Sequence, residues 1–189
     1  MRIIAGRFGG RLLATPSGAA VRPTADRVRE ALFNILAHGI DGFAFAGIRV
    51  LDLFAGTGAL GLEALSRGSA FCLFVEEAAP ARASIRRNVE ALGLTGVTKI
   101  FRRDATDLGP AGAHGGARLA FLDPPYGKGL AEGALLSLLQ GGWLAPGAVV
   151  VIEEGKTAHV TLPPQVTAID QRTWGDSQVL FARLEPKRL

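Results

Sequence analysis

The segment whose residue types are best suited to chemistry is Asp123-Pro124-Pro125-Tyr126, which follows the apolar run Leu119–Leu122. The run predicts a buried strand, and the two prolines cannot extend a sheet ladder because they lack N–H groups. Asp123 is therefore expected at the carboxyl end of the strand, where open α/β sheets bind their ligands. A carboxylate, free carbonyls and an aromatic ring would suit a planar nitrogenous group. Taken alone, the same residues could also form a turn with a capping Asp and a packing Tyr.

A second candidate site is the loop after the strand-like run 48–54, where Gly56, Gly58 and Gly61 have G-x-G-x-x-G spacing and open a helix-like segment. Small residues let the backbone approach a nucleotide, and a helix N-terminus offers unpaired N–H donors. This loop suits NAD and S-adenosylmethionine equally well. Asp52 favours the second ligand, because its carboxylate would repel a pyrophosphate and attract the ammonium of a methionine moiety. The same carboxylate could instead only cap the loop.

Carboxylates also end the next two predicted strands. Glu76 lies 20 positions after Gly56 and is placed to accept hydrogen bonds from the hydroxyls of a ribose. Asp104 could accept a hydrogen bond from an adenine amino group, or it could cap a local turn. With Asp52 and Asp123, four carboxylates fall at the ends of successive strands, and this regularity favours one shared site.

The elements that must position these residues alternate along the chain. Strands are predicted at 48–54, 70–75, 97–101, 119–122 and 148–152, with helices at about 24–38, 60–67, 79–92 and 130–139. Segments 166–172 and 178–184 could pair as a closing antiparallel hairpin. The alternation predicts a doubly wound, mostly parallel α/β sheet. Residues 1–22 read as a β-hairpin or short arm, with Gly9-Gly10 as its turn signal.

Composition narrows the class of protein. The chain has 189 residues and 48% hydrophobic content, which is typical of a globular domain with a core. No apolar run approaches the ~18–20 residues of a membrane span, and no signal peptide is expected. The single cysteine, Cys72, excludes an internal disulfide and fits a reducing cytoplasm; inside an apolar run it reads as a buried small hydrophobe. Three scattered histidines and one cysteine predict no metal site.

The net charge of +4 is concentrated at the N-terminus. Residues 1–30 hold six arginines and two acidic residues, so they account for all of it, and the remainder is neutral. A basic arm on a neutral domain is typical of a protein that binds a polyanion such as nucleic acid. The same arginines could form an ordinary solvated surface.

Two motifs carry a family resemblance. Asp52-Leu53-Phe54-Ala55-Gly56-Thr57-Gly58 resembles the S-adenosylmethionine loop of class I methyltransferases, and Asp123-Pro124-Pro125-Tyr126 resembles the motif of enzymes that methylate exocyclic amino nitrogens of bases. Segments 2–6, 22–24, 26–34 and 60–68 are similar to the bacterial 16S ribosomal RNA guanine-N2 methyltransferase family. The resemblance covers nearly the whole chain, most densely 2–76 and 119–146. The chain departs from the family pattern at Glu77-Ala78 and over 108–116.

The resemblance implies a Rossmann-like, seven-stranded methyltransferase domain over 23–189 behind a basic arm over 1–22. It implies S-adenosylmethionine as cofactor and 16S ribosomal RNA as substrate, within an assembling or assembled small subunit, for a monomeric cytoplasmic enzyme. The implied catalytic residues are Asp123, Pro124, Pro125 and Tyr126, where Asp123 and the Pro124 carbonyl accept the amine hydrogens and Tyr126 stacks on the base. The implied cofactor-binding residues are Thr24, Asp52, Phe54, Ala55, Gly56, Thr57, Gly58, Glu76, Asp104 and Ala105. The implied RNA-binding residues are Arg2, Arg7, Arg11 and Arg22.

Three rival interpretations remain open at the level of sequence. An amino methyltransferase acting on another RNA or on DNA would share the Asp-Pro-Pro-Tyr logic, although a DNA enzyme usually carries a sizeable target-recognition region for which the chain has no room. An NAD-dependent oxidoreductase is supported only by the glycine loop and Glu76. A non-catalytic RNA-binding module would keep the fold and lose cofactor binding.

Overall fold

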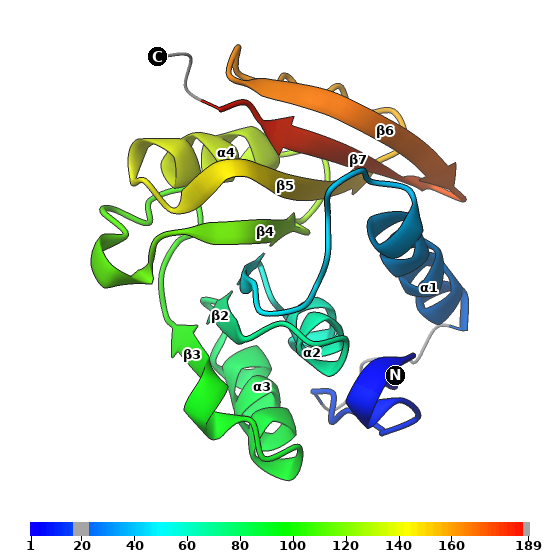
Figure 1. Cartoon of the computed structure of the whole chain (residues 1–189). Coiled ribbons are helices and arrows are strands. Elements are labelled where there is room, and N and C mark those ends of the chain that lie inside the picture. Colours follow the sequence, from blue (N-terminus) through cyan, green and yellow to red (C-terminus); the bar gives the residue numbers. More distant parts are fainter. Residues whose placement is uncertain (17–22, 187–189) are drawn as a thin grey trace. The chain divides into compact units, whose positions relative to one another are not determined.

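The computed structural model describes residues 1–16 and 23–186 and divides them between two compact units, Met1–Arg102 and Arg103–Leu189. The fold is α/β, with seven strands in a mostly parallel sheet. The predicted fold class is confirmed. Figure 1 labels the four α-helices and the strands β2 to β7.

In the first unit the strands run in the order β3-β2-β1 and all pair in parallel. Four of the five residues in β1 and in β2 are buried, as expected for strands covered on both faces. Helix α2 packs on β1 and β2, and α3 packs on β3 (Figure 1). The element bounds are α1 Pro23–His38, β1 Arg49–Leu53, α2 Ala59–Ser66, β2 Phe71–Val75, α3 Ala79–Ala91 and β3 Thr98–Phe101, with 3-10 turns at Gly6–Phe8 and Thr95–Val97.

The start of α2 lies very close to β2, and Gly61 makes this possible. A Cβ at Gly61 would stand 2.5 Å from Cys72 Sγ and 2.5 Å from Phe74 Cε1. Both of those side chains are fully buried in the core and have little room to move. The third glycine of the motif therefore serves helix–strand packing.

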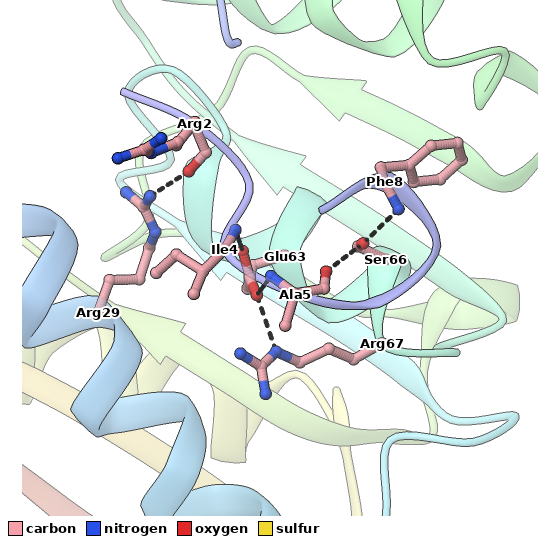
Figure 2. A network of polar contacts seen from close by, with 8 residues as sticks. All are labelled: Arg2, Ile4, Ala5, Phe8, Arg29, Glu63, Ser66 and Arg67. Carbon is pink, nitrogen blue, oxygen red and sulfur yellow. Dashed lines mark hydrogen bonds and ion pairs between the residues drawn. The ribbon is translucent and has the colours of Figure 1, made fainter. Parts of the chain in front are cut away.

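The N-terminal strap, defined as residues 1–16, is held on α2. Its ends meet in one isolated antiparallel bridge between Arg2 and Leu12, with a 3-10 turn between them, so the segment is closed like a hairpin but has no strands. Glu63 of α2 is fully buried and accepts hydrogen bonds from the N–H groups of Ile4 (2.7 Å) and Ala5 (3.0 Å), as Figure 2 shows. The strap's backbone is thus fixed by a carboxylate.

Two further contacts fix the strap next to Glu63. Ser66 Oγ donates to the Ala5 carbonyl (2.6 Å) and accepts from the Phe8 N–H (2.9 Å) (Figure 2). Gly6 has φ +80°, and a Cβ there would lie 2.0 Å from the Ser66 carbonyl oxygen. Any side chain at this position would push the strap off the helix.

In the second unit β4 pairs in parallel with β5, and β5, β7 and β6 pair antiparallel in that order. The closing hairpin predicted for this region is present. Helix α4 packs on β4 and β5 (Figure 1). The bounds are β4 Ala117–Leu122, α4 Leu130–Gln140, β5 Leu144–Gly155, β6 Val166–Trp174 and β7 Ser177–Leu184, with a 3-10 turn at Gly112–His114.

Strand β5 is longer than the sequence predicts. The expected strand ends at Ile152, whereas the observed strand continues to Gly155 because Glu153 pairs with Val179 and Glu154 with Gln178 of β7. The pairing partner comes from a segment more than twenty residues further along the chain, so local apolar pattern gives no sign of it. Among the described residues, no helix is both long and apolar enough to cross a membrane.

Candidate active site

The glycine loop of the first unit reverses the chain sharply between β1 and α2. Phe54, Gly56 and Gly58 have φ values of +58°, +55° and +78°, in the left-handed region. The Gly58 N–H donates to the Ala55 carbonyl at 2.7 Å and closes the turn. Phe54 is the one non-glycine residue in this region among those described, and such backbone strain is concentrated at functional sites. The loop is therefore a tight, strained turn, and its predicted role in binding the cofactor stays a prediction.

Asp52 lies at the end of β1 and is almost fully buried, with 1% of its surface exposed. Its Oδ2 accepts a hydrogen bond from the Gly61 N–H at 2.9 Å, so the carboxylate satisfies one of the unpaired donors in the first turn of α2. The interaction also places a negative charge at the positive end of the helix dipole. Attraction of a ligand ammonium by Asp52 stays a prediction.

Glu76 follows β2 and holds the glycine loop from the other side. Its Oε2 accepts from the Gly56 N–H at 2.8 Å, and its Oε1 accepts from the Ala78 N–H at 2.7 Å. The carboxylate is half-buried. It therefore fixes the first glycine of the loop, and the predicted contact with ribose hydroxyls stays a prediction.

A residue that sequence reasoning missed, Asn88 of α3, ties the loop to the N-terminal strap. Its Nδ2 donates to the Thr57 carbonyl and to the Ala14 carbonyl, both at 3.1 Å, and its Oδ1 accepts from the Ala14 N–H at 2.7 Å. The Thr57 hydroxyl donates to Met1 Sδ at 3.3 Å. No sequence signal marks Asn88, because its role depends on three segments that are distant along the chain.

Cys72 is a fully buried free thiol in β2, as predicted. Burial, and after it the Asp52 carboxylate, raises the pKa of this thiol well above its usual value. A thiol that stays protonated is a poor nucleophile, so Cys72 serves packing.

Asp104 and Ala105 belong to the second unit. Asp104 is exposed, and its Oδ1 accepts hydrogen bonds from the N–H and the hydroxyl of Thr106 at 2.8 and 2.7 Å. This is the turn-capping geometry that the sequence left open beside the adenine contact. Ala105 is buried.

Asp123 stands directly after β4, and its side chain reaches the surface. Burial, followed by the carboxylates of Glu153 and Glu154, raises the pKa of Asp123 to about 7. The two neighbouring carboxylates disfavour a further negative charge and therefore favour the protonated form of Asp123. No hydrogen-bond donor faces this carboxylate from the described part of the chain. Pro124 is buried and Pro125 is exposed.

Tyr126 has 44% of its surface exposed, and its hydroxyl donates a short hydrogen bond to Glu153 Oε1 at 2.6 Å. Desolvation and Glu153 raise the pKa of the phenol. Sequence reasoning missed Glu153 and Glu154. Their signal was available: an acidic pair directly follows the apolar run 148–152, the pattern that drew attention to Glu76.

The remaining predicted residues are on the strap and α1. Arg2, Arg7 and Arg11 are exposed, and the Arg7 guanidinium lies 5.1 Å from the centre of the Phe8 ring. Thr24 is the second residue of α1, which begins at Pro23, and its predicted contact with the cofactor stays a prediction. Arg22 lies outside the described residues.

Comparison with known proteins decides the family. The model of the family described as "Conserved hypothetical protein 95" matches residues 1–183. The chain belongs to that family. It is 43% identical to "Putative rRNA methyltransferase YlbH" of Bacillus subtilis, over 74% of this chain and 73% of the relative. It is 37% identical to "Ribosomal RNA small subunit methyltransferase D" of Escherichia coli K12, over 81% and 74%.

Solved structures agree with this membership. The structure of "Putative methyltransferase yhhF" from Escherichia coli superposes with a TM-score of 0.83 at 32% identity and covers 99% of both chains. The family recognised from sequence and its methyltransferase fold are therefore confirmed.

Proposed function

We propose that this chain transfers a methyl group from S-adenosylmethionine to the exocyclic N2 amine of a guanine in 16S ribosomal RNA. Family membership and relatives named as ribosomal RNA methyltransferases, which match over most of their length, make it a methyltransferase of ribosomal RNA that uses S-adenosylmethionine. The finer steps of the reaction are argued below from its own residues.

The observation that carries the proposal is the turn after β4. Asp123 is an exposed residue whose carboxylate has no hydrogen-bond donor in the described part of the chain, and the nearby Tyr126 has 44% of its surface exposed. The N2 amine of guanine is a weak nucleophile because its lone pair is delocalised into the ring. Hydrogen bonds from its two N–H groups to Asp123 and to the Pro124 carbonyl would draw the nitrogen toward a pyramidal shape, a positioning and electrostatic contribution. Tyr126 would stack on the base.

The first unit has the residues that suit the methyl donor. The space beside Gly56 is open, and a cationic ligand rich in hydroxyls fits the acceptors Asp52 and Glu76. A pyrophosphate would face the same two carboxylates at an electrostatic cost, which disfavours NAD. S-adenosylmethionine supplies a methyl sulfonium, and Asp52, Glu76 and the loop residues 54–58 would hold and orient it. Thr24, Asp104 and Ala105 complete the proposed cofactor set.

The exposed arginines of the N-terminal strap suit RNA phosphates. Arg2, Arg7 and Arg11 lie on a backbone fixed to α2, so little ordering is needed when RNA binds. We expect the double substitution of Arg7 and Arg11 by Gln to weaken RNA binding and to lower the slope of log K against log salt by about 1–2. Filter binding over a salt series measures this slope. Replacement of the exposed Arg86 and Arg87 of α3 by Gln is the matched control, and an unchanged slope in the Arg7/Arg11 variant would remove these residues from the RNA interface.

The cellular setting belongs to the same proposal. A monomer in the cytoplasm would act on the small subunit during or after its assembly. A paired guanine hides its N2 group, so the target base must be single-stranded or flipped out of its helix.

The deciding experiment is transfer of labelled methyl from S-adenosylmethionine to 16S ribosomal RNA and to small subunits from a strain that lacks this modification, followed by mapping of the methylated base. Label on guanine N2 supports the proposal. Label on adenine or on DNA would replace it with one of the related amino methyltransferase activities. Cofactor binding with no transfer to any nucleic acid would refute it.

A further inference from the structure

Strand β5 ends beside the Asp123 turn. The parallel pairs Phe121–Val151 and Leu122–Ile152 place the ends of β4 and β5 side by side. The next residue of β4's segment is Asp123, and the next of β5 is Glu153. Continuation of this register explains why Glu153 is the charged residue that does most to raise the pKa of Asp123.

Glu153 holds the Tyr126 ring by its far end. The hydroxyl of Tyr126 donates to Glu153 Oε1 at 2.6 Å, the length of a charge-assisted O–H···O⁻ bond. Gly155 lies against the other end of the ring: a Cβ there would stand 3.5 Å from Tyr126 Cβ and 3.6 Å from its Cδ2. Ser177 also interacts with the hydroxyl. The ring is therefore fixed in orientation while nearly half of its surface stays open.

Glu154 fixes the backbone that follows the ring. It is 3% exposed, and its Oε1 accepts from the N–H groups of Gly127 and Gly155, both at 2.8 Å. Successive side chains of a strand point to opposite faces, so the two glutamates hold the Tyr126–Gly127 segment from different sides. The hydrogen bonds of both carboxylates go to the turn that follows Asp123 and to Gly155.

A ring held by its hydroxyl, with open surface, has the geometry of a stacking platform and not of a packing side chain. We infer that Glu153 is a positioning residue for methyl transfer: its hydrogen bond fixes the Tyr126 ring in the orientation that receives the target base. This inference rests on the proposed function. Glu153 acts through Tyr126 and makes no contact with the base.

A double-mutant cycle tests the inference directly. Glu153→Ala and Tyr126→Phe each remove one partner of the bond, and each should lower kcat/KM for RNA by about 10- to 100-fold, mainly through KM. The double variant should be no slower than the slower single variant, because both remove the same interaction. Losses that multiply would show that the two residues act independently and would overturn the inference.

The conservative variant separates positioning from charge. In Glu153→Gln the amide oxygen can still accept from the Tyr126 hydroxyl, so activity should recover to within a few-fold of wild type. A Glu153→Gln variant as slow as Glu153→Ala would overturn the hydrogen-bond role. Glu90→Ala, on the exposed face of α3, is the matched control and should behave as wild type.

The contact between Tyr126 and Glu153 can also be tested by spectroscopy, without a methyl-transfer assay. Tyr126 is the only tyrosine in the chain, so ultraviolet difference spectra report its ionisation alone. Glu153 raises the pKa of this phenol, and the phenolate should therefore appear at lower pH in folded Glu153→Ala than in wild type. An unchanged titration would overturn the contact. If the wild-type enzyme fails to methylate guanine N2 while this shift is seen, the proposed function fails and the contact stands.

Discussion

The site carboxylates of the first unit and Asp123 of the second unit face opposite situations. Asp52, Glu63 and Glu76 each accept hydrogen bonds from backbone N–H groups, at 2.7–3.0 Å. Asp123 instead faces the carboxylates of Glu153 and Glu154 and has no hydrogen-bond donor in the described part of the chain. The fold compensates the first three charges, as it does Asp104 and Glu154 of the second unit, and leaves the charge of Asp123 without compensation.

This difference separates two uses of the same residue type. A compensated carboxylate orders backbone, because it pays the cost of burial with fixed donors, and its loss should appear in stability or in the shape of the loop. An uncompensated carboxylate destabilises its surroundings and is useful only when a ligand brings the donors. The N2 amine of a guanine would bring two N–H donors. Three substitutions and two pH titrations can break this contrast or sharpen it.

The largest effect is expected at Glu63. Glu63→Ala leaves the N–H groups of Ile4 and Ala5 and the guanidinium of Arg67 without their acceptor. Removal of one partner from a buried charged network costs about 3–5 kcal/mol. Urea denaturation should show this loss, with a smaller one for Glu63→Gln, which keeps an acceptor oxygen. A loss below about 1 kcal/mol would mean that the strap is not anchored by this carboxylate.

Asp123 should show the reverse pattern, with lost activity and no lost stability. Asp123→Ala should slow methyl transfer by about 10²–10³-fold, as expected when one preorganised hydrogen-bonding partner of the reacting group is removed. Affinity for S-adenosylmethionine by isothermal titration should be nearly unchanged. Near-normal turnover in this variant would show that Asp123 has no part in the reaction.

Glu76 should act both on the backbone of the glycine loop and on ligand binding, with a smaller effect than at Glu63 or Asp123. Glu76→Ala releases the N–H of Gly56 and removes an acceptor from the proposed cofactor set. A charged hydrogen bond contributes about 1.5–3 kcal/mol, so the Kd for S-adenosylmethionine should rise about 10- to 100-fold. Glu77→Ala, the exposed neighbour, is the control. Equal affinities in the two variants would place the cofactor elsewhere.

The pH dependence of kcat/KM should be the smallest of these effects and the one most specific to an uncompensated carboxylate. Because the pKa of Asp123 is raised to about 7 and the acceptor form is ionised, kcat/KM should fall tenfold per pH unit below about 7. Asp123→Asn should lack this limb. A limb near pH 4 in wild type would show that the neighbouring glutamates do not act on Asp123.

The same shift affects stability with a defined sign. A carboxyl whose folded pKa lies above its ordinary 3.8 stabilises the fold at low pH, and this stabilisation is lost as pH rises through about 7. The stability of wild type relative to Asp123→Asn should therefore decline between pH 4 and pH 7.

The sequence pattern predicted those elements whose structure depends on residues close together in the chain. The apolar runs gave β1, β2 and β4, the glycine spacing gave the reversal before α2, and the two prolines gave the position of Asp123 after β4. The four strand-end carboxylates were found by type and place. The partners of Asp52 and Glu76 were not, because each is a backbone N–H group whose position depends on the folded loop.

The misses share one cause, which is contact between segments distant in sequence. β5 extends through Glu154 because β7 pairs with it, and Asn88 matters because the strap and the glycine loop both reach it. The strap was expected as a β-hairpin or short arm with no stated partner, whereas Glu63 and Ser66 bind its backbone to α2. In each case the partner residue has an unremarkable local sequence.

The anchoring of the strap by Glu63 also sets an order in time. The hydrogen bonds from Ile4 and Ala5 to Glu63 join residues 59 and 58 positions apart. At about 5–20 residues per second, the ribosome adds Glu63 roughly 3–12 s after these first residues. The strap is therefore synthesised before α2, and the N–H groups of Ile4 and Ala5 lack the Glu63 acceptor until that helix has formed. A chain arrested before α2 would carry its arginine-bearing strap unanchored beside the ribosome's own RNA.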